Sequence, residues 1–329
     1  MHRQFEVRRE RFALKAPFRI SRGVKTAAEV VVVRVTEDGR DGRGEAVPYA
    51  RYGESLDSVE AELATVAEAV CAGAGREEVQ TLLPPGAARN ALDCALWDLA
   101  ARRAGNEVSA LLGRGALPAL ATAVTISLDS PPAMAAAARA LAGAPLLKVK
   151  VGPEDVEPRI AAVRGAAPGA RLIVDPNESW DIDLLARLQP ALRALDVELV
   201  EQPLPAGEDA GLRGFEPLVP ICADESCHTA ADLPRLTGLY GAVNIKLDKT
   251  GGLTAALELH DAARAQGFRL MVGCMVCSSL AIAPALHLAG DADWVDLDGP
   301  MWLQADRPGG VCIENGRLIP PTPGFWGSQ

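Results

Sequence analysis

A charged residue closes each of several short apolar runs in the middle of the chain, and the runs recur at nearly constant spacing. The runs LLKVK, RLIVD, VELVE, ICAD and VNIK end at Lys150, Asp175, Glu201, Asp224 and Lys246. The gaps between these ends are 25, 26, 23 and 22 residues, and Ala- and Leu-rich segments long enough for a helix fill them. A buried strand followed by a helix at this period is typical of βα units in a parallel sheet.

The period predicts eight strands in the second part of the chain, arranged as a parallel barrel. The strand candidates are 121–127, 146–150, 171–175, 197–201, 219–224, 242–246, 269–273 and 293–297. The helix candidates are 131–142, 154–166, 181–194, 206–213, 229–236, 252–266 and 277–289. The eighth strand is followed by GPMWLQADRPGG, which has no helical pattern. We therefore expect an α/β fold with a (β/α)7β TIM-like barrel over residues 116–305.

The first third of the chain does not follow this period. Segments 3–9, 29–36 and 41–47 have the pattern of antiparallel strands, and segments 55–74 and 87–104 have the pattern of helices. Strands followed by helices predict a separate α+β domain over about residues 1–115. The tail has a turn at ENGR that is typical of a hairpin, and we expect the last residues, about 306–329, to return to this first domain.

Composition excludes several kinds of partner. The net charge of −10 argues against nucleic acid, because phosphate binding needs clustered Lys and Arg. No apolar run reaches the roughly 18 residues of a membrane span, and MHRQFEVRRE lacks the apolar segment of a secretory signal. Seven scattered cysteines are typical of free thiols in a reducing compartment. We expect a cytoplasmic protein with a small-molecule substrate, and the sequence leaves a homo-oligomer open.

Three acids, Asp175, Glu201 and Asp224, end consecutive predicted strands. The carboxyl ends of barrel strands meet at one face, which is where barrel enzymes keep their catalytic groups. Three carboxylates without His or Cys form an all-oxygen site of the kind that Mg²⁺ prefers, whereas the structural alternative is a set of ion-paired acids. The neighbouring Asn177 and Glu225 have the chemistry to orient such ligands, or to be ordinary loop residues.

Lysines flank the acids on both sides. Lys148 and Lys150 are two residues apart on one strand, so they face the same side, and burial there requires counter-charge. Lys246 ends the sixth strand and Lys150 the second, so a closed ring of eight places them opposite each other. This arrangement suits the removal of a proton α to a carboxylate on one face and its return on the other, provided that a nearby cation lowers the lysine pKa. Lys249 is a competing candidate, but it falls beyond the strand.

The motifs KVK, VDPN, VEQP, ADES and NIKLDKTGG, in this order, resemble the muconate-lactonizing subgroup of the enolase superfamily. The resemblance covers nearly the whole chain, and it implies that the N-terminal α+β domain caps the barrel. It also implies one Mg²⁺ held by Asp175, Glu201 and Asp224. Lys150 and Lys246 would then be the acid/base pair, with Lys148 assisting.

Further motifs resemble the dipeptide epimerases of this subgroup, among them the bacterial L-Ala-D/L-Glu epimerases. They are RYGES, GAARNALDCALWDLAAR, GCMVCSS and the DxD of VDLDGP. The resemblance implies that Asp296 and Asp298 hold the α-ammonium of a dipeptide whose C-terminal residue is epimerised through an enediolate. The implied substrate is L-Ala-L-Glu or L-Ala-D-Glu, and the implied context is recycling of peptidoglycan peptides.

The rest of the substrate pocket is assigned more loosely. Arg22, in the ISRG loop, is the candidate for the distal carboxylate of the substrate, because guanidinium binds carboxylate in a bidentate manner. Its rivals are Arg19, Lys25 and Arg51. Thr125, Cys274 and Met275 end the first and seventh strands and are expected to line the pocket. Cys277 stands where relatives often carry Glu, so the shape of the pocket floor is left open.

Two other readings remain at this point. One is a different reaction of the subgroup, either a cycloisomerisation or the synthesis of o-succinylbenzoate, whose substrates carry no ammonium for Asp296 and Asp298 to bind. The other is a non-catalytic, metal-dependent binding protein on the same scaffold. A binding protein would exchange no α-hydrogen with solvent, which separates it from an enzyme.

Overall fold

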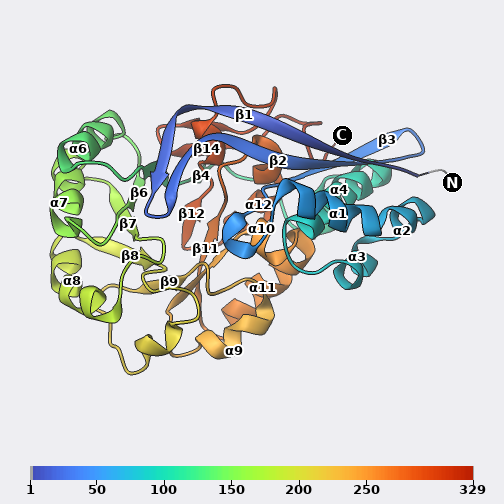
Figure 1. The fold of residues 1–329 in the computed structure, drawn as a ribbon. Helices are drawn as coiled ribbons and strands as arrows, with labels where there is room; N and C mark the ends of the chain where they lie inside the picture. Colours follow the sequence, from blue (N-terminus) through green and yellow to red (C-terminus); the bar gives the residue numbers. More distant parts are fainter. Residues whose placement is uncertain (1–2, 329) are drawn as a thin grey trace.

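In the computed structural model, which describes residues 3–328, parallel strands form a ring at the centre of the molecule (Figure 1). They pair in chain order as β5 (Val124–Ile126), β6 (Leu146–Lys150), β7 (Arg171–Asp175), β8 (Val197–Glu201), β9 (Ile221–Ala223), β10 (Ala242–Ile245), β11 (Arg269–Gly273) and β12 (Trp294–Asp296). A backbone hydrogen bond of 2.7 Å from Ala123 N to Val295 O links the two ends of this sheet. The predicted (β/α)7β barrel is thereby confirmed.

An apolar layer fills the bottom of the barrel. Each of the eight strands contributes one buried residue, and the residue for β5 directly precedes that strand. The eight are Ala123, Leu146, Ile173, Leu199, Cys222, Ala242, Met271 and Trp294. Because side chains alternate along a strand, the residue two positions further on faces the same interior. That rule places Asp175, Glu201 and Asp224 directly above Ile173, Leu199 and Cys222. The three acids therefore lie closer to the open end of the barrel than the apolar layer does.

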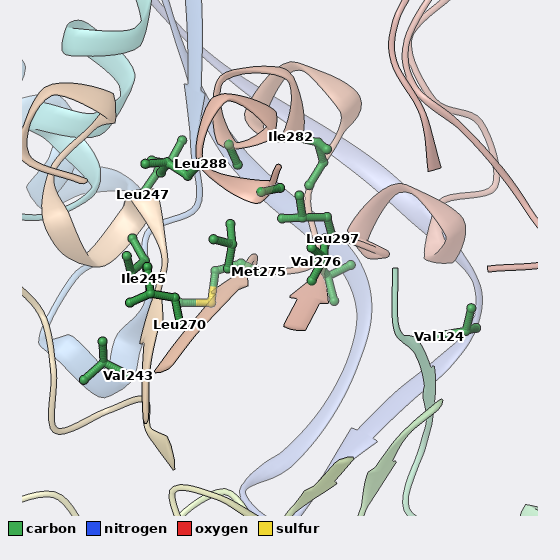
Figure 2. Packing of buried hydrophobic residues seen from close by; sticks show 14 of the residues in the cluster. Val124, Val243, Ile245, Leu247, Leu270, Met275, Val276, Ile282, Leu288 and Leu297 are labelled. Carbon is green, nitrogen blue, oxygen red and sulfur yellow. The ribbon is translucent and has the colours of Figure 1, made fainter. Parts of the chain in front are cut away.

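The outward-facing residues of the strands pack against helices. Val243 and Ile245 of β10 belong to the same buried cluster as Leu288 of α12 (Ser279–Ala289), as Figure 2 shows. The other helices around the barrel are α6 (Pro131–Ala140), α7 (Val156–Ala166), α8 (Ile182–Ala194), α9 (Leu233–Leu236), α10 (Leu247–Thr250) and α11 (Leu253–Ala265). A strand that is covered on both faces must be apolar along its length. This is why the barrel strands were recognisable as apolar runs in the sequence.

Two of the predicted helices differ from the structure. The one expected at 206–213 is wrong, because the chain makes only a 3₁₀ turn, η2 (Asp209–Leu212). Pro203, Pro205 and Gly207, whose φ is +98°, stand just before it and prevent a regular helix from starting. The one expected at 229–236 is split into η3 (Ala230–Asp232) and the short α9.

The N-terminal region is an antiparallel sheet backed by helices, as predicted, but its first two strands are longer than expected. They are β1 (Gln4–Ile20) and β2 (Gly23–Glu37), and β2 also pairs with β3 (Arg40–Ala46). The helical segments are η1 (Ala50–Tyr52), α1 (Leu56–Thr65), α2 (Ala67–Ala72), α3 (Arg76–Leu82), α4 (Ala87–Ala104) and α5 (Val108–Leu111). The β1–β2 hairpin reaches over the barrel, where Leu128 N donates to Arg19 O (Figure 1).

Helix α4 lies unusually close to strand β3. A Cβ atom at Gly42 or Gly44 would lie 2.1 Å from the carbonyl oxygen of Ala95 or Ala91, so only glycine allows this approach. The residues of α4 are nearly all buried, between the N-terminal sheet and the barrel. This explains why the sequence of α4 reads as apolar on more than one face.

The C-terminal hairpin exists, with β13 (Cys312–Glu314) and β14 (Arg317–Ile319), followed by a tail that contacts the N-terminal region. Strand β14 pairs with β4 (Leu120–Ala121) near the start of the barrel. In the tail, Trp326 Nε1 donates to Arg43 O at 2.8 Å and Gly327 N donates to Asp98 Oδ1 at 2.7 Å. The limits of the two predicted domains, 1–115 and 116–305, stay a prediction. None of the described helices combines the length and the apolar character needed to cross a bilayer.

A buried carboxylate ties the N-terminal region to the barrel. Asp248 of α10 accepts hydrogen bonds of 2.9 Å from Val47 N, just after β3, and from Asn90 Nδ2 on α4. Burial raises the pKa of Asp248 to about 7 and outweighs these two hydrogen bonds, which favour the ionised form. A carboxyl whose pKa is higher in the folded than in the unfolded chain lowers stability as pH rises from about 4 to 7.

Asp248→Asn should therefore stabilise the protein at high pH. The amide keeps an oxygen for Val47 N and Asn90 but carries no charge to desolvate. The melting temperature of the variant minus that of the wild type should grow between pH 5 and pH 8, by about 2–5 °C, and level off above pH 8. Calorimetric scans across this range measure it. A difference that stays constant with pH would contradict the assignment.

Candidate active site

The predicted site residues gather around one cavity of about 490 Å³ between the barrel mouth and the β1–β2 hairpin. The predicted residues that line it are Arg22, Thr125, Lys148, Lys150, Asn177, Asp224, Glu225, Lys246, Cys274, Met275, Asp296 and Asp298. Asp175 and Glu201 are buried at the ends of β7 and β8 and do not line it. The expectation that functional residues gather at the carboxyl ends of the strands thus brought together residues from the ends of all eight barrel strands.

Buried ion pairs hold the lysines and the acids in place. Lys150 Nζ lies 2.5 Å from Asp175 Oδ2, and Lys246 Nζ lies 2.6 Å from Asp224 Oδ2. Lys150 ends β6 and Lys246 follows β10, four positions further round the eight-stranded sheet. The two ammonium groups therefore approach one cavity from opposite sides.

Lys148 stands between several carboxylates. Its Nζ lies 2.7 Å from Glu201 Oε2, 2.7 Å from Asp296 Oδ2 and 3.1 Å from Asp175 Oδ2. Burial opposes its charge, but Asp296 and Glu201 outweigh burial and hold the pKa of Lys148 well above its usual value. Lys148 is therefore a fixed positive charge at the centre of the site.

The same competition sets the other pKa values. Burial works against charge on Lys246, yet Asp224 and Glu201 raise its pKa above the ordinary lysine value. Burial works against ionisation of Asp224, yet Lys246 and Lys249 keep the pKa of that carboxyl well below its usual range. The pKa of Glu201 is raised, by burial and by Asp175. With only protein groups around it, Lys246 is thus protonated, and a general base there requires its acidic neighbours to be neutralised by another cation.

The oxygen atoms at the strand ends have the chemistry of a Mg²⁺ site. Within residues 3–328, no three His, Cys, Asp or Glu side chains lie close enough together to hold a metal ion, since the lysines separate the acids. Buried oxygens nevertheless lack hydrogen bonds, namely Glu201 Oε2, Asn177 Oδ1 and Glu225 Oε2. Glu201 Oε2 is within ion-pair distance of Lys148 but accepts no hydrogen bond from it. Unsatisfied carboxylate and amide oxygens fit a hard divalent cation.

Sequence reasoning set Lys249 aside, but the structure places it against Asp224. Its side chain is fully buried, and its Nζ donates to Asp224 Oδ1 at 2.7 Å, Asp224 O at 2.5 Å and Asn244 O at 2.8 Å. Helix α10 starts directly after Lys246 and brings the Lys249 side chain to Asp224, the residue that follows β9. The sequence NIKLDKTGG shows that Lys249 follows Lys246 by three residues. It does not show that a short helix directs Lys249 toward Asp224.

Two amides that the sequence analysis missed also hold the acids. Gln202 Oε1 accepts from Asp224 N at 2.8 Å and from Ser226 N at 3.0 Å, which fixes the turn after β9. Asn244, on β10 and therefore two strands away from β8, donates from Nδ2 to Glu201 Oε1 at 2.9 Å. Asn244 lies two residues before Lys246, so the period of two along the strand was a signal that could have found it.

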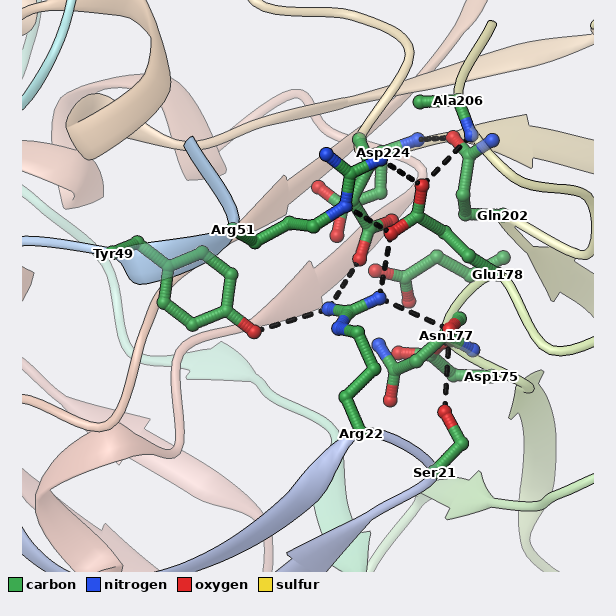
Figure 3. A network of polar contacts seen from close by, with 12 residues as sticks. Ser21, Arg22, Tyr49, Arg51, Asp175, Asn177, Glu178, Gln202, Ala206 and Asp224 are labelled. Carbon is green, nitrogen blue, oxygen red and sulfur yellow. Dashed lines mark hydrogen bonds and ion pairs between the residues drawn. The ribbon is translucent and has the colours of Figure 1, made fainter. Parts of the chain in front are cut away.

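The hairpin and the loop after β3 close the cavity through a charged cluster, shown in Figure 3. Arg22 donates to Glu178 Oε2 at 2.8 Å, to Glu225 Oε1 at 2.7 Å and to the hydroxyl of Tyr49 at 3.0 Å. Arg51 donates to both carboxylate oxygens of Glu178 at 2.7 and 2.8 Å. Although burial opposes its charge, Glu225 and Tyr49 raise the pKa of Arg22. The guanidinium of Arg22 is thus already engaged with acids of the barrel loops.

The remaining candidates line the wall near β5 and β12. Asp298 Oδ2 accepts from Thr125 N at 2.7 Å, and burial together with Asp296 raises the pKa of Asp298 to about 6. Asp296 Oδ1 is buried and accepts no hydrogen bond. Cys274 and Met275 follow β11 and line the cavity beside them. A wall with two acids and an unsatisfied oxygen suits a positively charged group of a substrate.

A barrel with opposed lysines above strand-end acids is the arrangement of a metal-assisted acid/base enzyme. The family model "Enolase C-terminal domain-like" matches residues 133–325. The model of the mandelate racemase / muconate lactonizing enzyme N-terminal domain matches residues 2–113. The chain belongs to this family, the enolase superfamily.

Several relatives are similar over their whole length. The L-Ala-D/L-Glu epimerase of Escherichia coli is 50% identical over 96% of this chain and 99% of its own. The N-acetyl-D-glutamate racemase of Pseudoalteromonas is 45% identical over 91% of this chain and 95% of its own.

Solved structures agree with these likenesses. An enolase family member from Agrobacterium tumefaciens, solved with sodium and L-Ala-L-Glu, is 48% identical with a TM-score of 0.96 over 99% of this chain and 100% of its own. A dipeptide epimerase from Enterococcus faecalis, solved with Mg and L-Leu-L-Tyr, is 30% identical with a TM-score of 0.90 over 97% of both chains.

The contacts of Lys249 generate a prediction about metal affinity. Lys249→Met should weaken Mg²⁺ binding by about 10- to 100-fold, because groups that orient a ligand commonly contribute that much. Titration calorimetry with MgCl₂ measures the affinity, and the control is Lys15→Met on the outer hairpin. A folded Lys249→Met protein that binds Mg²⁺ as tightly as the wild type would remove this role from Lys249.

Proposed function

We propose that the protein is a Mg²⁺-dependent dipeptide epimerase, an isomerase that inverts the α-carbon of the C-terminal residue of L-Ala-L-Glu or L-Ala-D-Glu. The observation that carries the proposal is the approach of Lys150 and Lys246 to one cavity from opposite sides. Support comes from the names of relatives that match over nearly their full length, several of which are dipeptide epimerases.

The two lysines exchange roles in this scheme. The amine of one lysine takes the α-proton and becomes an ammonium, while the ammonium of the other delivers a proton to the opposite face of the same carbon and becomes an amine. Between the two transfers the electron pair is spread over the substrate carboxylate as an enediolate. No atom is gained or lost overall, and the configuration is inverted.

Asp175, Glu201 and Asp224 are the proposed Mg²⁺ ligands, with Asn177 and Glu225 orienting them. When bound, the ion supplies positive charge where negative charge develops on the substrate carboxylate, and it neutralises the acids that now raise the pKa of Lys246. Lys148 adds a fixed positive charge on the same strand as Lys150. Neutralised acids and a nearby cation both favour the free amine that a base requires.

Asp296 and Asp298 are proposed to hold the α-ammonium of the dipeptide. Both are buried on the cavity wall, and Asp296 Oδ1 has no hydrogen-bond partner among the described residues. Thr125, Cys274 and Met275 complete this wall of the pocket. Arg22 remains the sequence-based candidate for the distal carboxylate.

A second candidate is racemisation of an N-acylated glutamate, because one relative is named N-acetyl-D-glutamate racemase. Such a substrate has no ammonium, so neither Asp298 nor the unpaired Oδ1 of Asp296 would gain a positively charged partner from it. That mismatch favours the dipeptide. The two relatives named above are an epimerase and a racemase, which favours inversion of an α-carbon over cycloisomerisation, o-succinylbenzoate synthesis or a non-catalytic binding role.

The cellular setting follows from the substrate and the cysteines. All seven cysteines are free, two of them exposed, which suits a reducing compartment. We therefore place the enzyme in the cytoplasm. Dipeptides of Ala and Glu arise when peptidoglycan peptides are broken down, so recycling of those peptides is the proposed context.

Exchange of the α-hydrogen in D₂O tests the two-base scheme. With Mg²⁺, the wild type should incorporate one deuterium at the α-carbon of the Glu residue from either epimer of L-Ala-Glu. Lys150→Ala and Lys246→Ala should each lower epimerisation by about 10²- to 10⁴-fold, because each removes one acid/base partner. Each variant should still exchange the epimer that the remaining lysine deprotonates. Mass spectrometry and proton NMR measure both quantities.

Lys15→Ala is the matched control, since Lys15 is exposed on β1 and its ammonium forms, among residues 3–328, a single hydrogen bond, to Met301 O. Wild-type protein that exchanges no dipeptide α-hydrogen would remove the proposed function. A lysine variant that still epimerises at the wild-type rate would remove the two-base scheme while leaving the substrate class in place.

Asp298→Asn separates the two candidate substrates. Loss of the charge should lower kcat/KM for L-Ala-L-Glu by about 10-fold or more, because an ammonium loses a charged partner. The effect on N-acetylglutamate should be small or favourable, since no ammonium is bound. Steady-state kinetics with both compounds measure this, and equal losses would contradict the ammonium assignment.

A further inference from the structure

One cation on the cavity wall, Lys25, forms no ion pair with any residue that the structure describes. The cavity is lined by Arg22, Lys25, Arg51, Lys148, Lys150 and Lys246. Every one of these except Lys25 forms an ion pair with an acid of the barrel or its loops. Within residues 3–328, no hydrogen bond or ion pair is formed by Lys25 Nζ. It is therefore the positive charge that the cavity leaves available to an incoming anion.

The surroundings of Lys25 keep its ammonium at the cavity. Its Nζ lies 4.9 Å from the centre of the Tyr49 ring, and the side chain is only partly exposed. Burial lowers the pKa of Lys25, and the nearby charges of Arg22 and Lys246 act in the same direction, while Asp248 opposes them. A partly desolvated ammonium that rests on an aromatic ring gains most from a direct anionic partner.

Arg22 is less available for the same task. Its guanidinium already donates to Glu178, Glu225, the Tyr49 hydroxyl and Asn177 O, at 2.7 to 3.0 Å. A substrate carboxylate that displaced these contacts would lie beside two carboxylates and would leave them unpaired. Truncating or displacing one partner of a buried charge pair is costly, so this exchange is unfavourable.

We propose that Lys25 receives the side-chain carboxylate of an acidic second residue of the substrate and thereby sets the preference for acidic dipeptides. This inference rests on the proposed function. It divides the three charges of L-Ala-L-Glu among three places: the ammonium at Asp296 and Asp298, the α-carboxylate between the opposed lysines, and the side-chain carboxylate at the hairpin. Arg22 and Glu178 then position the hairpin that carries Lys25.

Lys25→Met tests the proposal with two substrates of nearly equal shape, L-Ala-L-Glu and L-Ala-L-Gln. The variant keeps the unbranched apolar chain of lysine and loses its charge. Its kcat/KM for L-Ala-L-Glu should fall by about 10- to 100-fold, mostly through KM, because the lost contact is present in the ground state. Its kcat/KM for L-Ala-L-Gln should change by less than about 3-fold.

Two further variants sharpen the test. Lys25→Arg should keep most of the preference for L-Ala-L-Glu, and Lys15→Met, which makes the same substitution elsewhere on the hairpin, should leave both substrates unaffected. Equal losses for the two dipeptides in Lys25→Met would show a merely structural role and overturn the proposal. An unchanged preference for the acidic dipeptide would overturn it as well.

Binding separates this inference from the proposed function. Titration calorimetry with Mg²⁺ and each dipeptide reads the charge preference without turnover. If the wild type binds L-Ala-L-Glu more tightly than L-Ala-L-Gln and Lys25→Met does not, the inference stands even if no α-hydrogen exchanges and the proposed function fails. If the wild type binds both equally, the inference fails whatever the exchange experiment shows.

Discussion

The contact of one buried ammonium with three carboxylates is the interaction on which the site depends. Lys148 Nζ lies within 3.1 Å of oxygens from Asp175, Glu201 and Asp296, which come from three different strands. Without a cation among them, these acids would repel one another in a medium that screens charge poorly. Lys148 therefore allows a barrel of mostly apolar strands to end in a concentration of negative charge.

Much of the barrel, including the strand ends that line the site, could be predicted from the sequence because buried parallel strands are constrained to be apolar. A parallel strand covered on both faces must be apolar until it reaches the mouth, so runs such as RLIVD mark the strand and its functional residue together. The hairpin was harder to predict, since most of residues 10–28 are half-buried or exposed and carry no long apolar run. Lys249 was set aside because the short helix α10, which brings its side chain to Asp224, leaves no recognisable pattern in the sequence.

The two parts of the molecule divide the work. The barrel supplies the lysines that we propose for proton transfer, and these are held by buried ion pairs with acids that amides such as Gln202 position in turn. The N-terminal region supplies the covering hairpin and the η1 segment, which Arg22 and Arg51 respectively fasten to the barrel loops through the shared partner Glu178. The proposed catalytic groups are thus carried by rigid strands. Selectivity for the substrate's side chain is assigned to the hairpin, which substitutions can alter without disturbing the acids.

The apolar layer at the bottom of the barrel makes the cavity a dead end. Ile173, Leu199, Trp294 and their neighbours leave no passage through the ring, so both epimers must enter and leave past the same hairpin. Forward and reverse turnover accordingly share a single entrance. A change that stiffens or loosens the covering hairpin should alter the two directions alike, leaving the equilibrium ratio of epimers to the dipeptides themselves.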